Sequence, residues 1–346
     1  MKVLYISNYR SNRNRSGKRL NPLRRIKRAF SGSPIGGQDG FFAASLYTVF
    51  DVTGRTFEWF KKNAHHINRS YDAVLVNQRI GYDNSIVHKE DLSFIRHLTV
   101  TKGLVVTNAE AGILPPDDVL DLFDVVFKRE HYIDLDRYRI SESNKAKIRN
   151  TMLGCPFIDV TTRNVRRIVP GNLGYSNPSE EFCHDLFFAG KTTHPSRLAS
   201  LQRLYSEGFD MGGGLTPHRK YGEPVPGELK ARRVSIGRFA EIMRGSRINL
   251  AIEGKGEYTF RHNEALFLCT FMISSPSVRG LKLPLPIVEN THYVCFEDLD
   301  DLVDKVRYFL SHDSERRKIA QAGRNLFAKE YSFQKHGEYI RKSLQG

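Results

Sequence analysis

Residues 248–274 read INLAIEGKGEYTFRHNEALFLCTFMIS, in which a short apolar run, a glycine-bearing loop, a helical pattern and a second apolar run follow one another. Residues 248–252 and 271–274 are typical of buried strands. Between them, residues 262–268 are predicted to form a helix. A helix that connects two buried strands indicates that the strands run parallel in one sheet.

The same alternation of strands and helices extends outward from this stretch in both directions. Strands are also predicted at residues 2–7, 71–76, 103–107, 124–128 and 186–189. Helices are predicted at residues 57–67, 91–98, 116–122, 195–205, 238–244, 302–310, 316–329 and 333–344. Residues 41–49 fit either a helix or a helix that runs into a strand. The pattern predicts an α/β protein with two doubly wound, mostly parallel sheets.

A break in the alternation separates the two halves. It lies at residues 165–181 and is rich in turn formers, namely Pro170, Gly171, Asn172, Gly174, Asn177 and Pro178. We therefore expect an N-terminal domain over residues 1–164, a linker over 165–181 and a C-terminal domain over 182–332. Residues 333–346 form a final helix in this division.

Composition argues against several protein classes. Hydrophobic residues make up 40% of the chain, which is too apolar for a disordered protein. The longest apolar run, at residues 265–273, is far shorter than the roughly 18–20 residues of a membrane span. The cysteines (Cys155, Cys183, Cys269 and Cys295) form no C-x-x-C pair, which argues against a zinc cluster or a disulfide framework. These features predict a cytoplasmic protein.

Positive charge is concentrated at the N-terminal end. The chain has a net charge of +15, and ten basic residues precede the first acidic residue, Asp39. This basic arm, residues 1–38, has two interpretations. It is either an electropositive flap for a polyanion, such as an anionic membrane surface, a phosphorylated acceptor or nucleic acid, or a solvated loop. Attraction to a membrane would place the protein at its inner face.

The loop that follows residues 248–252 carries the strongest signal for a ligand site. Gly254 and Gly256 lie in this loop, and Arg261 and Glu264 lie at the start of the next helix. Glycines allow a ligand to approach the backbone, and Arg261 beside a helix N-terminus favours a phosphate group. Glu264 would accept hydrogen bonds from ribose or sugar hydroxyls. The alternative is an Arg–Glu ion pair on an exposed helix.

Four segments resemble one class of enzymes. They are FDVVFKRE at residues 123–130, FFAGKTTHPSR at 187–197, RHNEALFLCTFMI at 261–273, and the helical tail at 296–344. Together they resemble GT-B glycosyltransferases, in particular the CgeB-like (spore-maturation type) group. The resemblance implies two Rossmann-like domains that face a cleft, with the last helix packed back on the N-terminal domain.

The resemblance also implies which residues bind the substrate. The C-terminal domain would hold a nucleotide-sugar donor, and the N-terminal domain would hold the acceptor. The residues implied near the donor diphosphate are Gly190, Lys191, Arg197 and Arg261. Glu264 would bind the ribose hydroxyls.

The sequence leaves open whether the transfer is retaining or inverting and which residue is the catalytic base. Six residues separate Glu257 from Glu264, whereas seven separate the paired glutamates of many retaining GT-B enzymes. An inverting transfer needs a carboxylate or a histidine that takes the acceptor's proton. Asp39, in a glycine cluster, and Glu110, just after a predicted strand, are the two candidates. Asp39 equally fits a simple turn residue.

We expect no metal ion and no cofactor, because the nucleotide sugar is itself the substrate. Asp134-Leu-Asp136 and Asp298-Leu-Asp300 match the Asp-x-Asp pattern of metal-dependent transferases. However, Asp298 directly precedes a predicted helix, where aspartate caps well. A GT-B enzyme can stabilise its leaving diphosphate with lysine, arginine and helix dipoles instead.

Two classes of function therefore remain. The first is a glycosyltransferase that moves a sugar from a nucleotide sugar to a hydroxyl of a polar acceptor, either a glycan or a lipid-linked molecule. The second is a nucleic-acid-binding protein, or a glycosyltransferase that acts on DNA, which uses the basic arm. A pure DNA-binding protein has no need for Arg261 and Glu264 beside two glycines, which favours the first class.

Overall fold

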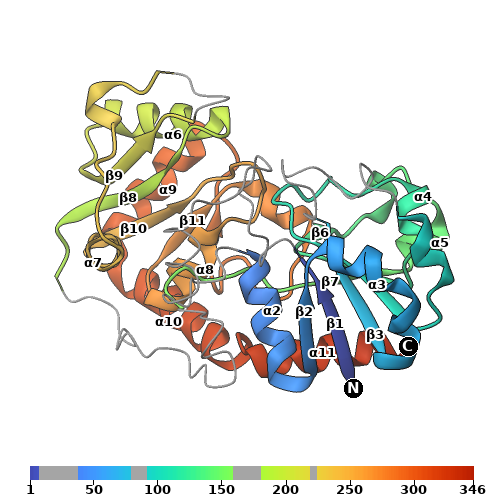
Figure 1. The fold of residues 1–346 in the computed structure, drawn as a ribbon. Coiled ribbons are helices and arrows are strands. Elements are labelled where there is room, and N and C mark those ends of the chain that lie inside the picture. Colours follow the sequence, from blue (N-terminus) through green and yellow to red (C-terminus); the bar gives the residue numbers. More distant parts are fainter. Residues whose placement is uncertain (8–37, 79–91, 159–180, 219–223) are drawn as a thin grey trace, which may run out of the picture. The chain divides into compact units, whose positions relative to one another are not determined.

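The structure is a computed structural model, and it describes residues 1–7, 38–78, 92–158, 181–218 and 224–346. The chain forms two compact units, each built around a parallel β-sheet (Figure 1). Unit 1 comprises Met1–Gly154, Ile158–Gly171 and Ser332–Gly346, and unit 2 comprises Cys155–Phe157 and Asn172–Tyr331. In the described ranges, no helix is long and apolar enough to cross a membrane. Most of the basic arm and nearly all of the predicted linker lie outside these ranges.

Unit 1 contains a sheet of six parallel strands in the order β2-β1-β3-β4-β5-β7. The strands are β1 (Lys2–Ile6), β2 (Asp51–Arg55), β3 (Ala73–Asn77), β4 (Thr101–Val106), β5 (Val125–Lys128) and β7 (Ile148–Asn150). The helices are α2 (Gln38–Val49), α3 (Phe57–Ser70), α4 (Asp117–Leu120), α5 (Glu142–Lys145) and α11 (Phe333–Gln345). A two-residue strand, β6 (His131–Tyr132), follows β5.

Helices cover both faces of this sheet because its strands are apolar on both sides. In β1, Leu4 and Ile6 belong to one core, together with residues of α3. Val3 and Tyr5 belong to a second core, together with residues of α2 and α11. Since successive side chains of a strand point to opposite faces, a strand with two apolar faces must be covered twice.

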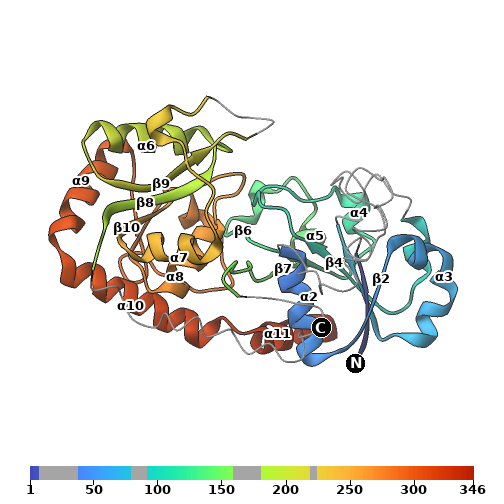
Figure 2. The same cartoon turned by 60° about the vertical axis from the view of Figure 1, so that its left-hand side comes forward.

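The last helix, α11, packs on α2 within unit 1 (Figure 2). A Cβ on Gly337 would lie 2.5 Å from the carbonyl oxygen of Ser45, so this close approach requires glycine. His336 is buried at the same contact, where burial lowers its pKa to about 3. Its Nε2 accepts a hydrogen bond from the backbone N–H of Met152, so Nδ1 carries the proton and donates to Ser45. The neutral imidazole thus joins α11, α2 and the segment after β7.

Unit 2 contains a sheet of five parallel strands in the order β13-β11-β10-β8-β9. The strands are β8 (His184–Lys191), β9 (Met211–Thr216), β10 (Ser246–Ala251), β11 (Met272–Ser274) and β13 (Val294–Cys295). The helices are α6 (Pro195–Ser206), α7 (Ile236–Arg244), α8 (Phe260–Leu268), α9 (Leu299–Ser311) and α10 (Asp313–Glu330). A two-residue strand, β12 (Leu281–Lys282), lies between β11 and β13 in the chain.

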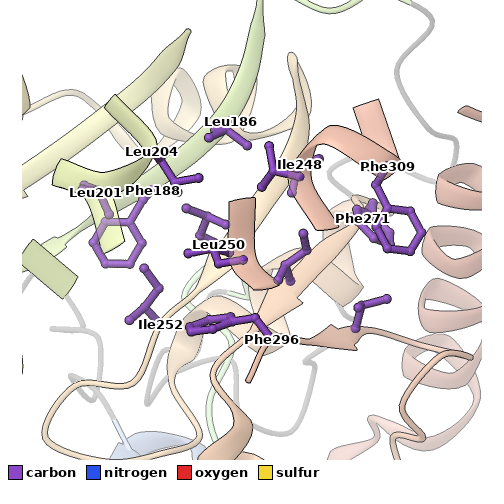
Figure 3. Close-up of a cluster of buried hydrophobic side chains, with 14 of the residues drawn as sticks. Leu186, Phe188, Leu201, Leu204, Ile248, Leu250, Ile252, Phe271, Phe296 and Phe309 are labelled. Atoms are coloured by element: carbon purple, nitrogen blue, oxygen red, sulfur yellow. The ribbon is translucent and has the colours of Figure 1, made fainter. Parts of the chain in front are cut away.

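One buried cluster holds β8 and β10 against their helices (Figure 3). Its members include Leu186, Phe188, Leu201, Leu204, Ile248, Leu250 and Phe309, which come from β8, α6, β10 and α9. Burial of one such side chain stabilises a protein by about 1.5–3 kcal/mol. This packing therefore fixes the positions at which β8 and β10 end.

The predicted alternation of strands and helices is confirmed in both units, with local differences. Residues 41–49 are helical throughout and belong to α2. Residues 91–98, predicted as an α-helix, contain only a 3₁₀ helix at Ser93–His97. Its buried neighbours Leu92, Ile95 and Leu98 recur every third residue, which is the 3₁₀ period.

Among the described strands, the sequence pattern misses the two-residue strands β6 and β12 and four strands of the parallel sheets, namely β2, β7, β9 and β13. The clearest case is β9, in which residues 212–214 are all glycine, a residue with low strand propensity. A Cβ on Gly213 would lie 2.2 Å from the carbonyl oxygen of Phe188 in β8, and the φ of Gly213 is 94°. The pairing of β9 with β8 therefore requires glycine at this position.

Candidate functional site

The strand order of unit 2 reverses between β8 and β10, which are adjacent in the sheet. In open α/β sheets, ligands bind at this switch point, beyond the carboxyl ends of the strands. β8 ends there with Gly190 and Lys191, and Glu253 and Gly254 follow β10. We call residues 189–191 and 252–264 the switch edge.

Arg197, in the first turn of α6, joins the two strand ends. Its guanidinium donates hydrogen bonds to the carbonyl oxygens of Lys191 (2.9 Å), Ile252 (3.1 Å) and Glu253 (2.7 Å). An arginine carries five N–H donors, so among the described contacts two remain for a ligand. Arg197 therefore both fixes the switch edge and presents positive charge at it.

Gly254 makes room for this guanidinium. A Cβ at residue 254 would lie 2.4 Å from Nη2 of Arg197. Any side chain at this position would push Arg197 away from the ends of β8 and β10. Gly254 therefore has a packing role in addition to the predicted approach of a ligand. Gly190 also leaves room for Arg197, since a Cβ at residue 190 would lie 3.1 Å from Nη1 of Arg197.

The start of α8 is held in place by its own first turn. Thr259 and His262 form a capping box, in which each side chain bonds to the backbone of the other residue. His262 also bonds to the Ser274 hydroxyl at 2.9 Å and stacks on Tyr258, with ring centroids 4.4 Å apart. The N-terminus of α8 therefore has a fixed direction at the switch edge.

Arg261 and Glu264 form an ion pair three residues apart on α8. The pair is buried, which differs from the exposed pair considered as the alternative. Arg261 also donates to the carbonyl oxygen of Ala189 at 2.6 Å, and its guanidinium lies over the rings of Phe187 and Phe239. Its Nε is buried without a hydrogen-bond partner. Burial raises the pKa of Glu264, and the charge of Arg261 opposes that change.

The two arginines act on each other electrostatically. Burial lowers the pKa of Arg197 to about 10, the charge of Arg261 lowers it as well, and Glu253 opposes both effects. Two guanidinium groups that repel each other at a strand end favour the binding of an anion. Lys191 is exposed at the end of β8 and adds a third cation to the same edge.

The switch edge thus brings most of the predicted donor residues together. Gly190, Lys191 and Arg197 lie in direct contact with one another. Arg261 and Glu264 are linked to the same strand end through Ala189. Glu257 lies in the loop between β10 and α8, where it is half-buried.

The loop after β4 in unit 1 is held by an unusual set of contacts. Each backbone carbonyl of residues 108–111, which include Glu110, accepts a hydrogen bond from a side chain. Lys128 donates to residues 108 (3.3 Å) and 110 (2.8 Å), Arg129 to residue 109 (3.1 Å), and Tyr138 to residue 111 (2.6 Å). The backbone that carries Glu110 is therefore strongly constrained.

Sequence reasoning does not select Lys128 and Arg129 as site residues. Lys128 is 0% exposed, and Arg129 pairs with Glu130, which is also 0% exposed. The available signal is a run of three charged residues that begins at the last residue of the apolar strand β5. A buried charge needs a specific partner, so such a run indicates specific contacts. Asp39 lies in the first turn of α2, and its side chain is outside the described part of the structure.

Both Asp-x-Asp sequences serve as helix caps. Asp298 accepts hydrogen bonds from the backbone N–H groups of Asp300 (3.0 Å) and Asp301 (2.9 Å), which confirms the predicted cap. Asp134 accepts from the backbone N–H of Asp136 at 3.0 Å. Among the residues that the structure describes, no group of three or more His, Cys, Asp or Glu could hold a metal ion.

Comparisons with known proteins agree with this architecture. Residues 197–342 match the protein family described as "Glycosyl transferase-like". No curated protein sequence matches the chain.

Three solved structures share the fold over nearly the whole chain. One is the DNA-modifying enzyme beta-glucosyltransferase, with a TM-score of 0.53, 12% identity and 100% of each chain covered. HepE from Anabaena, in complex with UDP and glucose, has a TM-score of 0.54 and 8% identity, with 100% of this chain and 99% of HepE covered. Sucrose-phosphate synthase from Thermosynechococcus elongatus has a TM-score of 0.53 and 10% identity, with 99% and 98% covered.

These similarities confirm the predicted fold class. Two doubly wound parallel sheets in the described units are the architecture of GT-B glycosyltransferases. The matched family segment contains Arg197, the loop after β10 and all of α8. The comparisons thus show the GT-B fold for the chain and a match of its C-terminal part, residues 197–342, to a glycosyl transferase-like family.

Proposed function

We propose that this protein transfers a sugar from a nucleotide-sugar donor to a hydroxyl group of a polar acceptor. The observation that carries the proposal is the pair of arginines, Arg197 and Arg261, at the switch edge beside the start of α8. Beta-glucosyltransferase was crystallised with uridine diphosphoglucose, and HepE with UDP and glucose. These two neighbours support a UDP-sugar as the donor.

In the proposed reaction, the acceptor oxygen bonds to the anomeric carbon while the bond from that carbon to the diphosphate breaks. The leaving diphosphate gains negative charge, which Lys191, Arg197 and Arg261 would stabilise as positioned donors. Glu264 accepts from Arg261 and keeps lone pairs that can accept from the ribose hydroxyls. We place Glu257 on the donor side as well. This mechanism assigns no role to a metal ion or a cofactor.

We assign the general base to Glu110 in preference to Asp39. The contacts at residues 108–111 fix the backbone from which Glu110 extends, and a base acts best from a fixed position. In an inverting transfer, Glu110 would take the acceptor's proton as the hydroxyl oxygen attacks.

The acceptor has two candidate classes. The resemblance to the CgeB-like group favours a glycan or a lipid-linked molecule, and an attraction of the basic arm to anionic lipid would place the protein at the inner face of the membrane. DNA is the second class. It is favoured by the shared fold with a DNA-modifying glucosyltransferase and by ten cations ahead of Asp39.

Calorimetric titration with UDP-, GDP-, ADP-, CMP- and dTDP-sugars tests the donor proposal. We expect a UDP-sugar to bind most tightly. We expect Lys191→Ala to weaken its binding roughly tenfold or more, since a charge-assisted hydrogen bond contributes about 1.5–3 kcal/mol. Lys318→Ala removes an exposed lysine of α10 and is the matched control. If the folded protein bound none of these sugars, the donor proposal would be wrong.

Transfer of labelled sugar into either lipid extract or duplex DNA separates the acceptor classes. The variant Arg24→Gln/Arg25→Gln/Lys27→Gln/Arg28→Gln removes four cations from the basic arm. If DNA is the acceptor, this variant should lose transfer to DNA in a salt-dependent manner and keep donor binding. Transfer into lipid or glycan, with none into DNA, would rule out the DNA proposal.

A further inference from the structure

Unit 2 has a positively charged pocket at the end of the sheet opposite to the switch edge. It is open to solvent and is lined by the start of β10, the start of α10 and Phe182 ahead of β8. Cys269 and Phe271 line its apolar side. We call it the amino-edge pocket, because parallel strands begin there. Its lining residues are all distinct from those of the switch edge.

Three arginines surround the ring of Phe182 in this pocket. The guanidinium carbons of Arg247, Arg316 and Arg317 lie 5.9, 5.8 and 5.7 Å from the ring centroid. An aromatic face attracts a guanidinium but does not neutralise its charge. Among the described residues that line the pocket, Asp313 is the one carboxylate.

The three arginines differ in their hydrogen bonds. Arg316 is 3% exposed and donates to the carbonyl oxygens at the end of α9 and to Asp313. Arg317 donates to the same carboxylate at 2.6 Å. Arg247 is exposed, and its guanidinium group has no hydrogen bond or ion pair with a described residue. Asp313 thus bonds to two guanidinium groups and attracts Arg247 only through its charge, so one carboxylate faces three guanidinium groups.

This excess of positive charge favours the binding of an anion in the amino-edge pocket. Burial lowers the pKa of Arg316, and the charges of Arg247 and Arg317 lower it as well, whereas Asp313 opposes them. An oxyanion between Arg247 and Arg317 would offset this repulsion. Guanidinium groups match phosphate well, because two parallel N–H bonds can donate to two of its oxygens.

We propose that the amino-edge pocket binds the phosphate group of a small phosphorylated ligand, at a site separate from the donor. Arg247 and Arg317 bind the phosphate, whereas Arg316 holds the wall by its bonds to α9 and Asp313. The ring of Phe182 and the apolar side of the pocket contact the body of the ligand. This function is additional to sugar transfer.

Calorimetric titration of the full chain with pyrophosphate, in the presence of saturating UDP, tests the proposal. UDP occupies the switch edge, so the remaining binding reports on other sites. We expect Arg247→Gln/Arg317→Gln to weaken pyrophosphate binding at least tenfold and to leave UDP affinity unchanged. The matched control is Arg232→Gln/Arg233→Gln, which removes two exposed arginines outside the pocket. Arg316 is left intact because it is buried and supports the end of α9.

The outcomes separate this site from the donor site. If both double variants lose pyrophosphate binding equally, the attraction is non-specific and the pocket proposal is wrong. If neither loses it, the pocket is not the site. A single-stranded oligonucleotide that binds through Arg247 and Arg317, without any pyrophosphate binding, would replace the proposal by a nucleic-acid site. If UDP itself does not bind, the donor proposal fails, and the two double variants still test the pocket when UDP is omitted.

Discussion

The two sheets share one strand order, in which the second strand in sequence is at the edge and the first lies beside the third. The buried cations at the carboxyl ends of the strands nevertheless make different interactions in the two units. In unit 1, Lys128 and Arg129 donate to carbonyls of a single loop. In unit 2, Arg197 also donates to carbonyls, but a second arginine, Arg261, lies close enough to lower its pKa. The first arrangement orders a loop, and the second also leaves positive charge for an anion. One topology can therefore order a loop in one unit and concentrate positive charge in the other.

The largest expected effect is on the rate constant of catalysis. Glu110→Gln should lower kcat by about 10²–10⁴-fold, because it removes the proposed base and keeps the shape of the side chain. The KM for the donor should stay unchanged, whereas Lys191→Ala should mainly raise that KM. Initial-rate kinetics on the two variants measure this difference.

Asp118→Asn, at an exposed aspartate in the same unit, is the control for Glu110→Gln. If Glu110→Gln keeps its kcat and Asp39→Asn loses it, the base is Asp39. If both variants keep their kcat, unit 1 supplies neither proposed base.

The second prediction compares the unfolding free energy lost when each of two Arg–Glu pairs of equal spacing in unit 2 is broken. Arg261→Ala leaves Glu264 buried without its partner, which should cost about 3–5 kcal/mol of unfolding free energy. Arg238→Ala breaks the exposed Arg238–Glu241 pair, which should cost less than about 1 kcal/mol. Urea unfolding followed by circular dichroism measures both. Equal losses would contradict the burial of the Arg261–Glu264 pair.

The third prediction concerns the acid stability of unit 1. His336 has a pKa of about 3 when folded, against an ordinary value of 6.5, so between these values the unfolded state binds the extra proton. The contribution of His336 to the unfolding free energy should be fully present above pH 6.5. Between pH 6.5 and pH 3, the unfolding free energy should fall by about 1.4 kcal/mol for each unit of decreasing pH. His336→Gln should remove this dependence. Trp59 in α3 is the single tryptophan of the chain, so its fluorescence during urea unfolding reports on unit 1. An unchanged slope in His336→Gln would show that other groups cause the acid sensitivity.

The smallest effect tests whether Lys128 acts through Glu110. Lys128→Met removes the donor to residues 108 and 110, and we expect about a tenfold loss of kcat with the donor KM unchanged, as is typical of a misplaced catalytic group. Lys147→Met is the matched control, because Lys147 donates to the carbonyl of Leu120, away from this loop. Equal kinetics for the two variants, at equal stability, would assign Lys128 a purely structural role.

Much of the fold follows from the sequence, because local patterns encode it. The strand–loop–helix–strand pattern of residues 248–274 appears as β10, α8 and β11. The cap at Asp298 is also local and is present as predicted. By contrast, β9 forms with three glycines because its backbone lies against Phe188 of β8, a contact that no local pattern contains.

The candidate site is predictable in its residue types but not in its contacts. The i, i+3 spacing of Arg261 and Glu264 suggests an ion pair, yet its burial depends on Phe187 and Phe239 from other elements. Likewise, the carbonyl groups that Lys128 bonds to lie about twenty residues earlier in the chain, so the local sequence does not show that Lys128 is buried. Contacts between residues that are distant in sequence are therefore the feature of the site that composition and spacing do not predict.

The place of α11 has a consequence for biosynthesis. A ribosome makes all of unit 2 before it makes α11, so unit 2 can fold while unit 1 still lacks a helix. Until then, the surface of α2 around Ser45 has no cover, and nascent unit 1 exposes apolar side chains such as Phe42. Chaperones that shield nascent chains would therefore act mainly on unit 1. A premature stop codon at residue 333 would leave unit 2 complete and expose unit 1, without α11, to proteolysis.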